Sequence, residues 1–146
     1  TVVATDLSAE ALDVARRNAV RYDVDGRIRF VQTDLLRHVE TPFDLVVSNP
    51  PYVPESERAA LQPEVRDHEP SIALFAGDGG LSFIRRLVGE ATARLKSGGF
   101  LVFECGFGQS AAVHELLAGH GALRDIELLH DLQGIPRTAI ARKIAS

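Results

Sequence analysis

The 146-residue sequence contains no methionine, no tryptophan and a single cysteine, Cys105. One cysteine cannot form a disulfide within the chain, and it cannot build a zinc site that needs several cysteines. It ends the apolar run 100–105, where we expect a small buried hydrophobic residue rather than a nucleophile. Because translation starts with methionine and this sequence begins at Thr1, we expect it to be part of a longer protein.

Long apolar segments and an excess of positive charge are also missing. No run approaches the ~18 apolar residues of a transmembrane helix, and no signal peptide is visible. The net charge is -4 and the arginines are scattered, which argues against nucleic acid and mildly for a protein partner. The five histidines lack the spacing of metal ligands. We therefore expect a soluble cytoplasmic protein with no membrane segment and no metal.

The composition that remains is that of an ordinary globular protein. Hydrophobic residues make up 45% of the chain and charged residues 25%, which fits one domain over residues 1–146. Alternating strand and helix patterns predict an α/β fold that ends in an antiparallel strand pair. The predicted strands are 1–6, 27–34, 43–48, 100–105, 123–130 and 137–143. One predicted helix starts after Ser8, and two more cover 81–95 and 110–117.

The apolar run 43–48 is followed at once by Asn49-Pro50-Pro51-Tyr52. The run predicts a buried strand, and the prolines end it because they lack a backbone donor and fix φ. Asn49 is therefore expected at a strand tip. The carboxyl ends of strands in open α/β sheets form the ligand crevice, which makes Asn49 a candidate binding residue. The alternative is a plain turn, because four residues alone are weak support for a site.

The tetrad 49–52 has the groups needed to hold a planar NH2 group. The side-chain carbonyl of Asn49 and the backbone carbonyl of Pro50 supply two acceptors, and Tyr52 can lie flat against the plane. An amide nitrogen is a poor nucleophile because its lone pair is delocalised, so orienting that lone pair is most of the catalytic task. Two acceptors also stabilise the charge that builds on nitrogen. The tetrad therefore fits transfer of a methyl group to such a nitrogen.

The tetrad resembles the substrate-amine motif of S-adenosyl-L-methionine-dependent methyltransferases that modify an amide or exocyclic nitrogen. Further stretches narrow the resemblance to the peptide chain release factor glutamine N5-methyltransferases, the HemK-type family, over the whole length of the chain. These stretches are 46–48, 65–70, 73–81 and 131–137.

The resemblance implies a Rossmann-like class I methyltransferase core that uses S-adenosyl-L-methionine to methylate a glutamine side chain of a release factor. Asn49, Pro50, Pro51 and Tyr52 would hold the amide. Glu69 would support it or order its loop, and a surface acid is the equal alternative. Family members carry a first strand, a glycine-rich loop and a helical docking domain before the position of Thr1. These are absent here, so we expect a central gap in the sheet.

Two acids follow predicted strands, Asp6 after 1–6 and Asp34 at the end of 27–34. In nucleotide-binding folds an acid after the second strand accepts from the ribose hydroxyls, which makes Asp6 a candidate ribose ligand. The alternative is that Asp6 only caps the following helix, although Ser8 suits that position better. The resemblance implies that Asp34 accepts from the adenine amino group and that Leu35 packs on the ring. Leu7 and Asn49 complete the predicted cofactor contacts.

Three alternatives stay open at this point. Adenine-N6 or guanine-N2 in nucleic acid presents the same planar NH2 group, although it calls for a basic face that the charge does not provide. A related enzyme that methylates a glutamine of a ribosomal protein would have the same motif. A non-catalytic module that pairs with a partner chain through exposed strand edges belongs to a different class.

Overall fold

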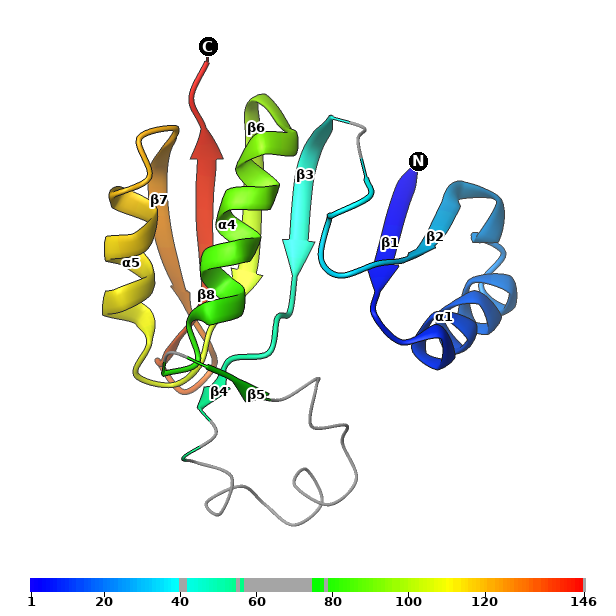
Figure 1. The fold of residues 1–146 in the computed structure, drawn as a ribbon, viewed down its shortest axis with the longest axis horizontal. Helices are drawn as coiled ribbons and strands as arrows, with labels where there is room; N and C mark the ends of the chain where they lie inside the picture. Colours follow the sequence, from blue (N-terminus) through cyan, green and yellow to red (C-terminus); the bar gives the residue numbers. More distant parts are fainter. Residues whose placement is uncertain (40–41, 55, 57–74, 78, 146) are drawn as a thin grey trace. The chain divides into compact units, whose positions relative to one another are not determined.

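The computed structural model describes residues 1–39, 42–54, 56, 75–77 and 79–145. The chain divides into two compact units, Thr1–Glu40 and Thr41–Ser146. Figure 1 labels the helices and strands of both. No helix in the described part of the chain is long and apolar enough to cross a membrane.

The first unit is a strand-helix-strand motif. Strand β1 (Val2–Asp6) leads into helix α1 (Ala9–Arg21), a 3-10 turn (Asp25–Arg27) and strand β2 (Ile28–Gln32). The two strands run parallel, with Asp6 opposite Gln32. Helix α1 begins where predicted, because the Oγ of Ser8 accepts a hydrogen bond of 3.0 Å from the backbone N–H of Ala11.

Strand β2 is shorter than the predicted strand 27–34. Arg27 belongs to the 3-10 turn, and Thr33 and Asp34 lie beyond the last paired residue. Leu35 has a φ of 51°, in the left-handed region, so the chain turns away from the extended direction directly after Asp34. The alternation of polar and apolar residues predicted a strand as far as Asp34, whereas the strand ends at Gln32.

The second unit contains a four-stranded sheet in the order β3-β6-β8-β7. Strands β3 and β6 are parallel, while β8 runs antiparallel to both β6 and β7, which confirms the predicted C-terminal antiparallel pair. A further short parallel pair joins β4 and β5. The bounds are β3 Phe43–Ser48, β4 Val53–Pro54, β5 Phe75–Ala76, α4 Ser82–Arg94, β6 Leu95–Glu104, α5 Ser110–Ala118, β7 Leu123–His130 and β8 Pro136–Lys143.

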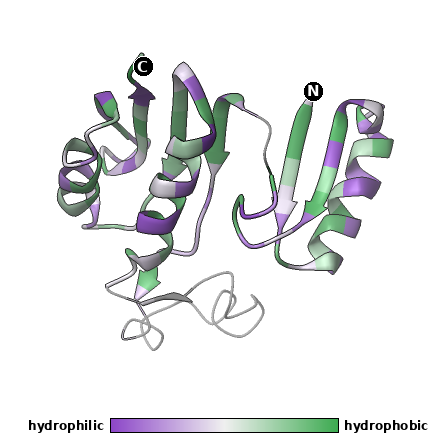
Figure 2. Ribbon diagram, turned by 45° about the horizontal axis from the view of Figure 1, so that its top comes forward, coloured by the Kyte–Doolittle hydropathy of each residue, from purple (hydrophilic) through white to green (hydrophobic). Residues whose placement is uncertain are grey.

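Helices α4 and α5 pack on this sheet and cover one of its faces (Figure 1). Side chains alternate between the two faces of a strand, so Leu101 and Phe103 of β6 are buried whereas Phe100 is exposed. Leu45 and Val47 of β3 are exposed in the same way. Figure 2 shows mixed hydropathy along α4, as expected of a helix that buries one side only. The buried residues of the two helices include Ile84, Leu87, Val88, Ala91, Val113 and Leu117.

Strand β6 starts five residues earlier than predicted, directly at the end of α4. Gly98 and Gly99 fall between the predicted helix 81–95 and the predicted strand 100–105, but both lie inside β6, where the pairing with β3 shifts register. Gly98 has a φ of 78°, and a Cβ at Gly99 would lie 3.1 Å from the backbone oxygens of Phe43 and Asp44. The glycines therefore allow an irregular strand rather than ending one.

Within the described residues, β1 pairs with β2 alone and β3 pairs with β6 alone. Each of these two strands therefore has one edge with no strand partner in the described part of the chain.

Candidate functional site

The tetrad lies where the sequence predicted it, directly after the last residue of β3, Ser48. Asn49 is exposed and Pro50 is buried. Because β3 and β6 run parallel, their carboxyl ends lie at the same end of the sheet, and β6 ends there with Glu104. The fold thus brings the tetrad and an acid from a distant part of the sequence to one sheet end.

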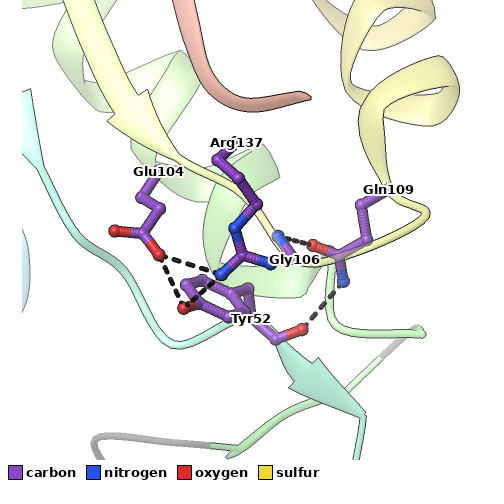
Figure 3. Close-up of polar contacts among 5 residues, drawn as sticks. All are labelled: Tyr52, Glu104, Gly106, Gln109 and Arg137. Carbon is purple, nitrogen blue, oxygen red and sulfur yellow. Dashed lines mark hydrogen bonds and ion pairs between the residues drawn. The ribbon is translucent and has the colours of Figure 1, made fainter. Parts of the chain in front are cut away.

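The side chain of Tyr52 is held by a charged pair, Glu104 of β6 and Arg137 of β8 (Figure 3). Its hydroxyl donates a hydrogen bond of 2.7 Å to Oε1 of Glu104. Nη2 of Arg137 donates to the Tyr52 hydroxyl oxygen and to Oε1 of Glu104, each at 3.1 Å. The Arg137 guanidinium also lies over the ring, 5.3 Å from its centroid. The ring is therefore fixed in orientation by three contacts.

The environment of Tyr52 determines the protonation state of its phenol group. Burial raises the pKa of Tyr52, and the hydrogen bond and negative charge of Glu104 raise it further, against a smaller opposing effect of Arg137. Tyr52 therefore stays a neutral hydrogen-bond donor at physiological pH. It can present a flat ring to a ligand, but it does not serve as a base.

Cys105 follows Glu104 and is fully buried, as the sequence predicted. Burial raises the pKa of its thiol, so the thiolate is disfavoured and the residue is a poor nucleophile. Its backbone N–H donates a 2.9 Å hydrogen bond to the carbonyl of Arg137. Cys105 thus helps to hold β8 beside β6 at the point where Arg137 contacts Tyr52.

In the first unit, Asp6 and Asp34 lie near the carboxyl ends of the parallel strands β1 and β2. Oδ1 of Asp6 accepts a 2.8 Å hydrogen bond from the backbone N–H of Ser8, so this carboxylate shapes the loop before α1. Gln32 donates through Nε2 to the carbonyl of Leu7 at 3.1 Å. The turn after β1 is therefore tied both to its own helix and to the neighbouring strand.

The residues around Asp34 carry an unsatisfied polar group. The hydroxyl of Thr33 is buried and has no hydrogen-bond partner within the described part of the chain. Leu35, with its left-handed backbone, follows directly after Asp34. A buried hydroxyl without a partner is costly, so a polar group of a ligand at this strand end would satisfy it.

The sequence predicted the tetrad but not the residues that hold it, namely Glu104, Gln109 and Arg137. Glu104 is an acid at the end of a strand, so the reasoning that selected Asp6 and Asp34 applies to it equally. Glu69, the remaining predicted site residue, lies outside the described residues. Among the described residues, no group of three or more potential metal ligands gathers.

The comparison with known proteins bears on both units. The family model for the methyltransferase small domain matches residues 1–65. A release factor glutamine methyltransferase of Bradyrhizobium diazoefficiens is 44% identical over 97% of this chain, which covers 48% of the relative. Three further proteins of that name, from Koribacter versatilis, Chlorobaculum tepidum and a Synechocystis strain, are 39%, 45% and 42% identical. The chain spans about half the length of these relatives.

Solved structures with lower sequence identity share the fold. The catalytic domain of hMettl16, in complex with a MAT2A 3'UTR hairpin, matches with a TM-score of 0.72 at 18% identity, over 99% of this chain and 55% of that one. A SAM-dependent O-methyltransferase of Thermotoga maritima matches with a TM-score of 0.69 at 13% identity, over 100% of this chain and 51% of that one. The chain therefore has the Rossmann-like fold of class I S-adenosylmethionine-dependent methyltransferases, and its sequence is similar to about half the length of several release factor glutamine methyltransferases.

Proposed function

We propose that this chain is the catalytic part of an enzyme that methylates the side-chain amide nitrogen of a glutamine in a peptide chain release factor, with S-adenosyl-L-methionine as the methyl donor. The observation that carries the proposal is the exposed Asn49 at the carboxyl end of β3, three residues before the fixed ring of Tyr52. The names of the relatives support the choice of substrate.

In this proposal the tetrad orients the amide. The side-chain oxygen of Asn49 and the carbonyl oxygen of Pro50 accept the two amide hydrogens, which fixes the plane of the NH2 group. Pro51 keeps the backbone extended after Pro50, and the ring of Tyr52 packs against the amide plane. Bound S-adenosyl-L-methionine supplies an electrophilic methyl group. The two acceptors direct the nitrogen lone pair and stabilise the charge that develops on nitrogen.

No side chain of the tetrad needs to act as a base in this proposal. The nitrogen acquires excess positive charge as it is methylated, and its surplus proton then leaves readily. The raised pKa of Tyr52 supports this division of roles, because a phenol that keeps its proton positions the substrate without removing a proton from it.

The cofactor's nucleoside would be held by the first unit. The carboxylate of Asp6, next to the exposed Leu7, suits the ribose hydroxyls, and Asp34 suits the adenine amino group, with Leu35 against the ring. The unpartnered Thr33 hydroxyl beside Asp34 supports a polar ligand at this strand end.

The test is transfer of a labelled methyl group from S-adenosyl-L-methionine to a purified release factor by the full chain. We expect labelling of the release factor that is lost in Asn49→Ala. The matched control is Asn18→Ala, because Asn18 is an exposed asparagine on α1. Equal transfer by the two variants, or transfer to RNA in place of the release factor, would overturn the proposal.

The cofactor site has its own experiment, calorimetric titration of the folded chain with S-adenosylhomocysteine. We expect micromolar binding that Asp6→Ala abolishes. Asp13→Ala is the control, because Asp13 is an exposed acid on α1 that pairs with Arg16. Absence of binding by the folded parent chain, or unchanged binding by Asp6→Ala, would contradict the assignment of the nucleoside contacts.

A further inference from the structure

We propose that Gln109 is a positioning residue for the tetrad, acting through the backbone of Tyr52. The inference extends the proposed function, because it names a residue outside the tetrad that sets the geometry of the amide site. Gln109 lies in the loop between β6 and α5 and is only 8% exposed.

The side-chain amide of Gln109 joins three backbone segments, and Figure 3 shows its contacts with two of them, at Tyr52 and Gly106. Its Nε2 donates to the carbonyl of Tyr52 at 2.8 Å and to the carbonyl of Gly79 at 3.1 Å. Its Oε1 accepts from the backbone N–H of Gly106 at 2.7 Å. The partners fix the orientation of the amide, because two carbonyls require donors and one N–H requires an acceptor.

Few side chains can make this set of contacts. Two donors and one acceptor in one plane are the groups of a carboxamide, and a carboxylate would set an oxygen against two carbonyl oxygens. Asparagine has the same groups on a side chain that is one methylene shorter. Gln109 also occupies the N-cap position of α5 without capping the helix through its side chain. The side chain of Gln109 binds the backbone of the tetrad, whereas a serine or aspartate at this position would cap α5.

Two glycines leave room for this arrangement. A Cβ at Gly80 would overlap the carbonyl oxygen of Tyr52 and Nε2 of Gln109. A Cβ at Gly106 would lie 2.7 Å from Oε1 of Gln109 and 3.2 Å from the Tyr52 ring. The distances to Gln109 and to the Tyr52 carbonyl are shorter than real Cβ atoms show, so the contacts of Gln109 require glycine at both positions.

The segment 104–109 therefore holds Tyr52 at both ends. Glu104 binds the phenol hydroxyl and Gln109 binds the backbone carbonyl. The Tyr52 carbonyl lies two residues beyond Pro50, whose own carbonyl is a proposed acceptor for the substrate amide. A displacement of about 1 Å in a positioning group can cost about 100-fold in rate, so release of this anchor should be visible in catalysis.

The first test reads Tyr52 directly and needs no activity. The chain has two tyrosines, so Tyr22→Phe leaves Tyr52 as the one tyrosine, and ring-13C labelling then reports on it alone by NMR. We expect Gln109→Leu and Gln109→Glu to shift or broaden its ring signals. The control is Gln133→Leu, because Gln133 is an exposed glutamine in the turn before β8. Unchanged Tyr52 signals in both Gln109 variants would overturn the proposal.

The second test separates positioning from general stability. We expect Gln109→Leu to lower kcat for methyl transfer by about 10- to 100-fold while its affinity for S-adenosylhomocysteine stays that of the parent. Equal loss of cofactor affinity and kcat would point to a merely structural role and would overturn the proposal. If the parent chain transfers no methyl group, the proposed function fails, and the NMR result still decides whether Gln109 positions Tyr52.

Discussion

The two units hold their candidate binding groups in different ways. In the first unit, the buried hydrophobic residues among the described positions are Leu12, Ala19 and Val39, and Asp6 is an exposed carboxylate fixed by one local hydrogen bond. In the second unit, a sheet with two packed helices carries Tyr52, whose ring, hydroxyl and carbonyl all have partners from distant segments. The proposed substrate site is thus preorganised, whereas the proposed nucleoside site depends on a short turn.

The difference has a physical basis in size. A segment of 40 residues buries a smaller fraction of its surface than a larger unit does, so it gains less hydrophobic stabilisation to offset its conformational entropy. The larger unit can maintain a buried polar network because its core fixes the strands that carry the network. We therefore expect the second unit to be the more stable part of the chain.

The largest expected effect comes from the core of the second unit. Phe103 on β6 is fully buried, so Phe103→Ala should lower the free energy of unfolding by about 3–5 kcal/mol. The matched control is Phe107→Ala, because Phe107 is 78% exposed and its loss should have little effect. Urea denaturation followed by circular dichroism measures both. Similar urea midpoints for Phe103→Ala and Phe107→Ala would contradict the assignment of Phe103 to the core of the second unit.

Hydrogen exchange compares the units directly. Amides of β1, β2 and α1 should exchange at least about tenfold faster than amides of β6 and β8, which corresponds to about 1.4 kcal/mol in opening free energy. The reason is the small core of the first unit. Exchange detected by mass spectrometry on peptides from each unit measures the difference. Equal protection in both units would mean that they open together.

A smaller effect is expected at the start of α1. Ser8→Ala removes the side-chain acceptor for the N–H of Ala11 and should cost about 1 kcal/mol in the first unit. Ser110→Ala is the control, because Ser110 is the first residue of α5 and not its N-cap. Thermal unfolding of the two variants measures the difference. A loss in Ser110→Ala as large as that in Ser8→Ala would contradict the capping role.

The smallest effect on stability concerns Tyr52 and is confined to high pH. Its pKa is raised from the ordinary value of 10.0, so the folded state keeps the proton more firmly than the unfolded state. The resulting stability is fully present below pH 10.0 and is lost as pH rises through the folded-state pKa. Absorbance titration of the phenolate in the Tyr22→Phe chain should give a midpoint above that of free tyrosine. Glu104→Gln should move the midpoint down, and a midpoint that stays in place would exclude Glu104 as a cause.

The sequence was sufficient where the signal is local. Strand 43–48 and the Ser8 cap were predicted where the structure has them, because a run of apolar residues and a capping serine act within a few residues. The polar strand predicted near 123–130 also has the observed bounds. The predicted start of β6 was wrong, because a pair of glycines such as Gly98-Gly99 occurs at a strand irregularity as readily as in a loop. A strand irregularity and a loop differ in how the glycine segment pairs with the neighbouring strand, and the local sequence carries no information about that pairing.

The network around Tyr52 could not be predicted for the same reason. Its partners Glu104, Gln109 and Arg137 stand 52, 57 and 85 residues away along the chain. Their meeting depends on the parallel pairing of β3 with β6 and the antiparallel return of β8. The tetrad itself was recognisable because its four residues are consecutive and its chemistry follows from their types.

The most direct measurement is to identify the atom that receives the methyl group when the full chain is incubated with labelled S-adenosyl-L-methionine and a release factor. The account predicts label on the side-chain amide nitrogen of a glutamine, retained in Asn18→Ala and lost in Asn49→Ala. Label on any other atom, or label on that nitrogen that survives Asn49→Ala, would contradict the central claim that the tetrad after β3 holds a glutamine amide for methylation.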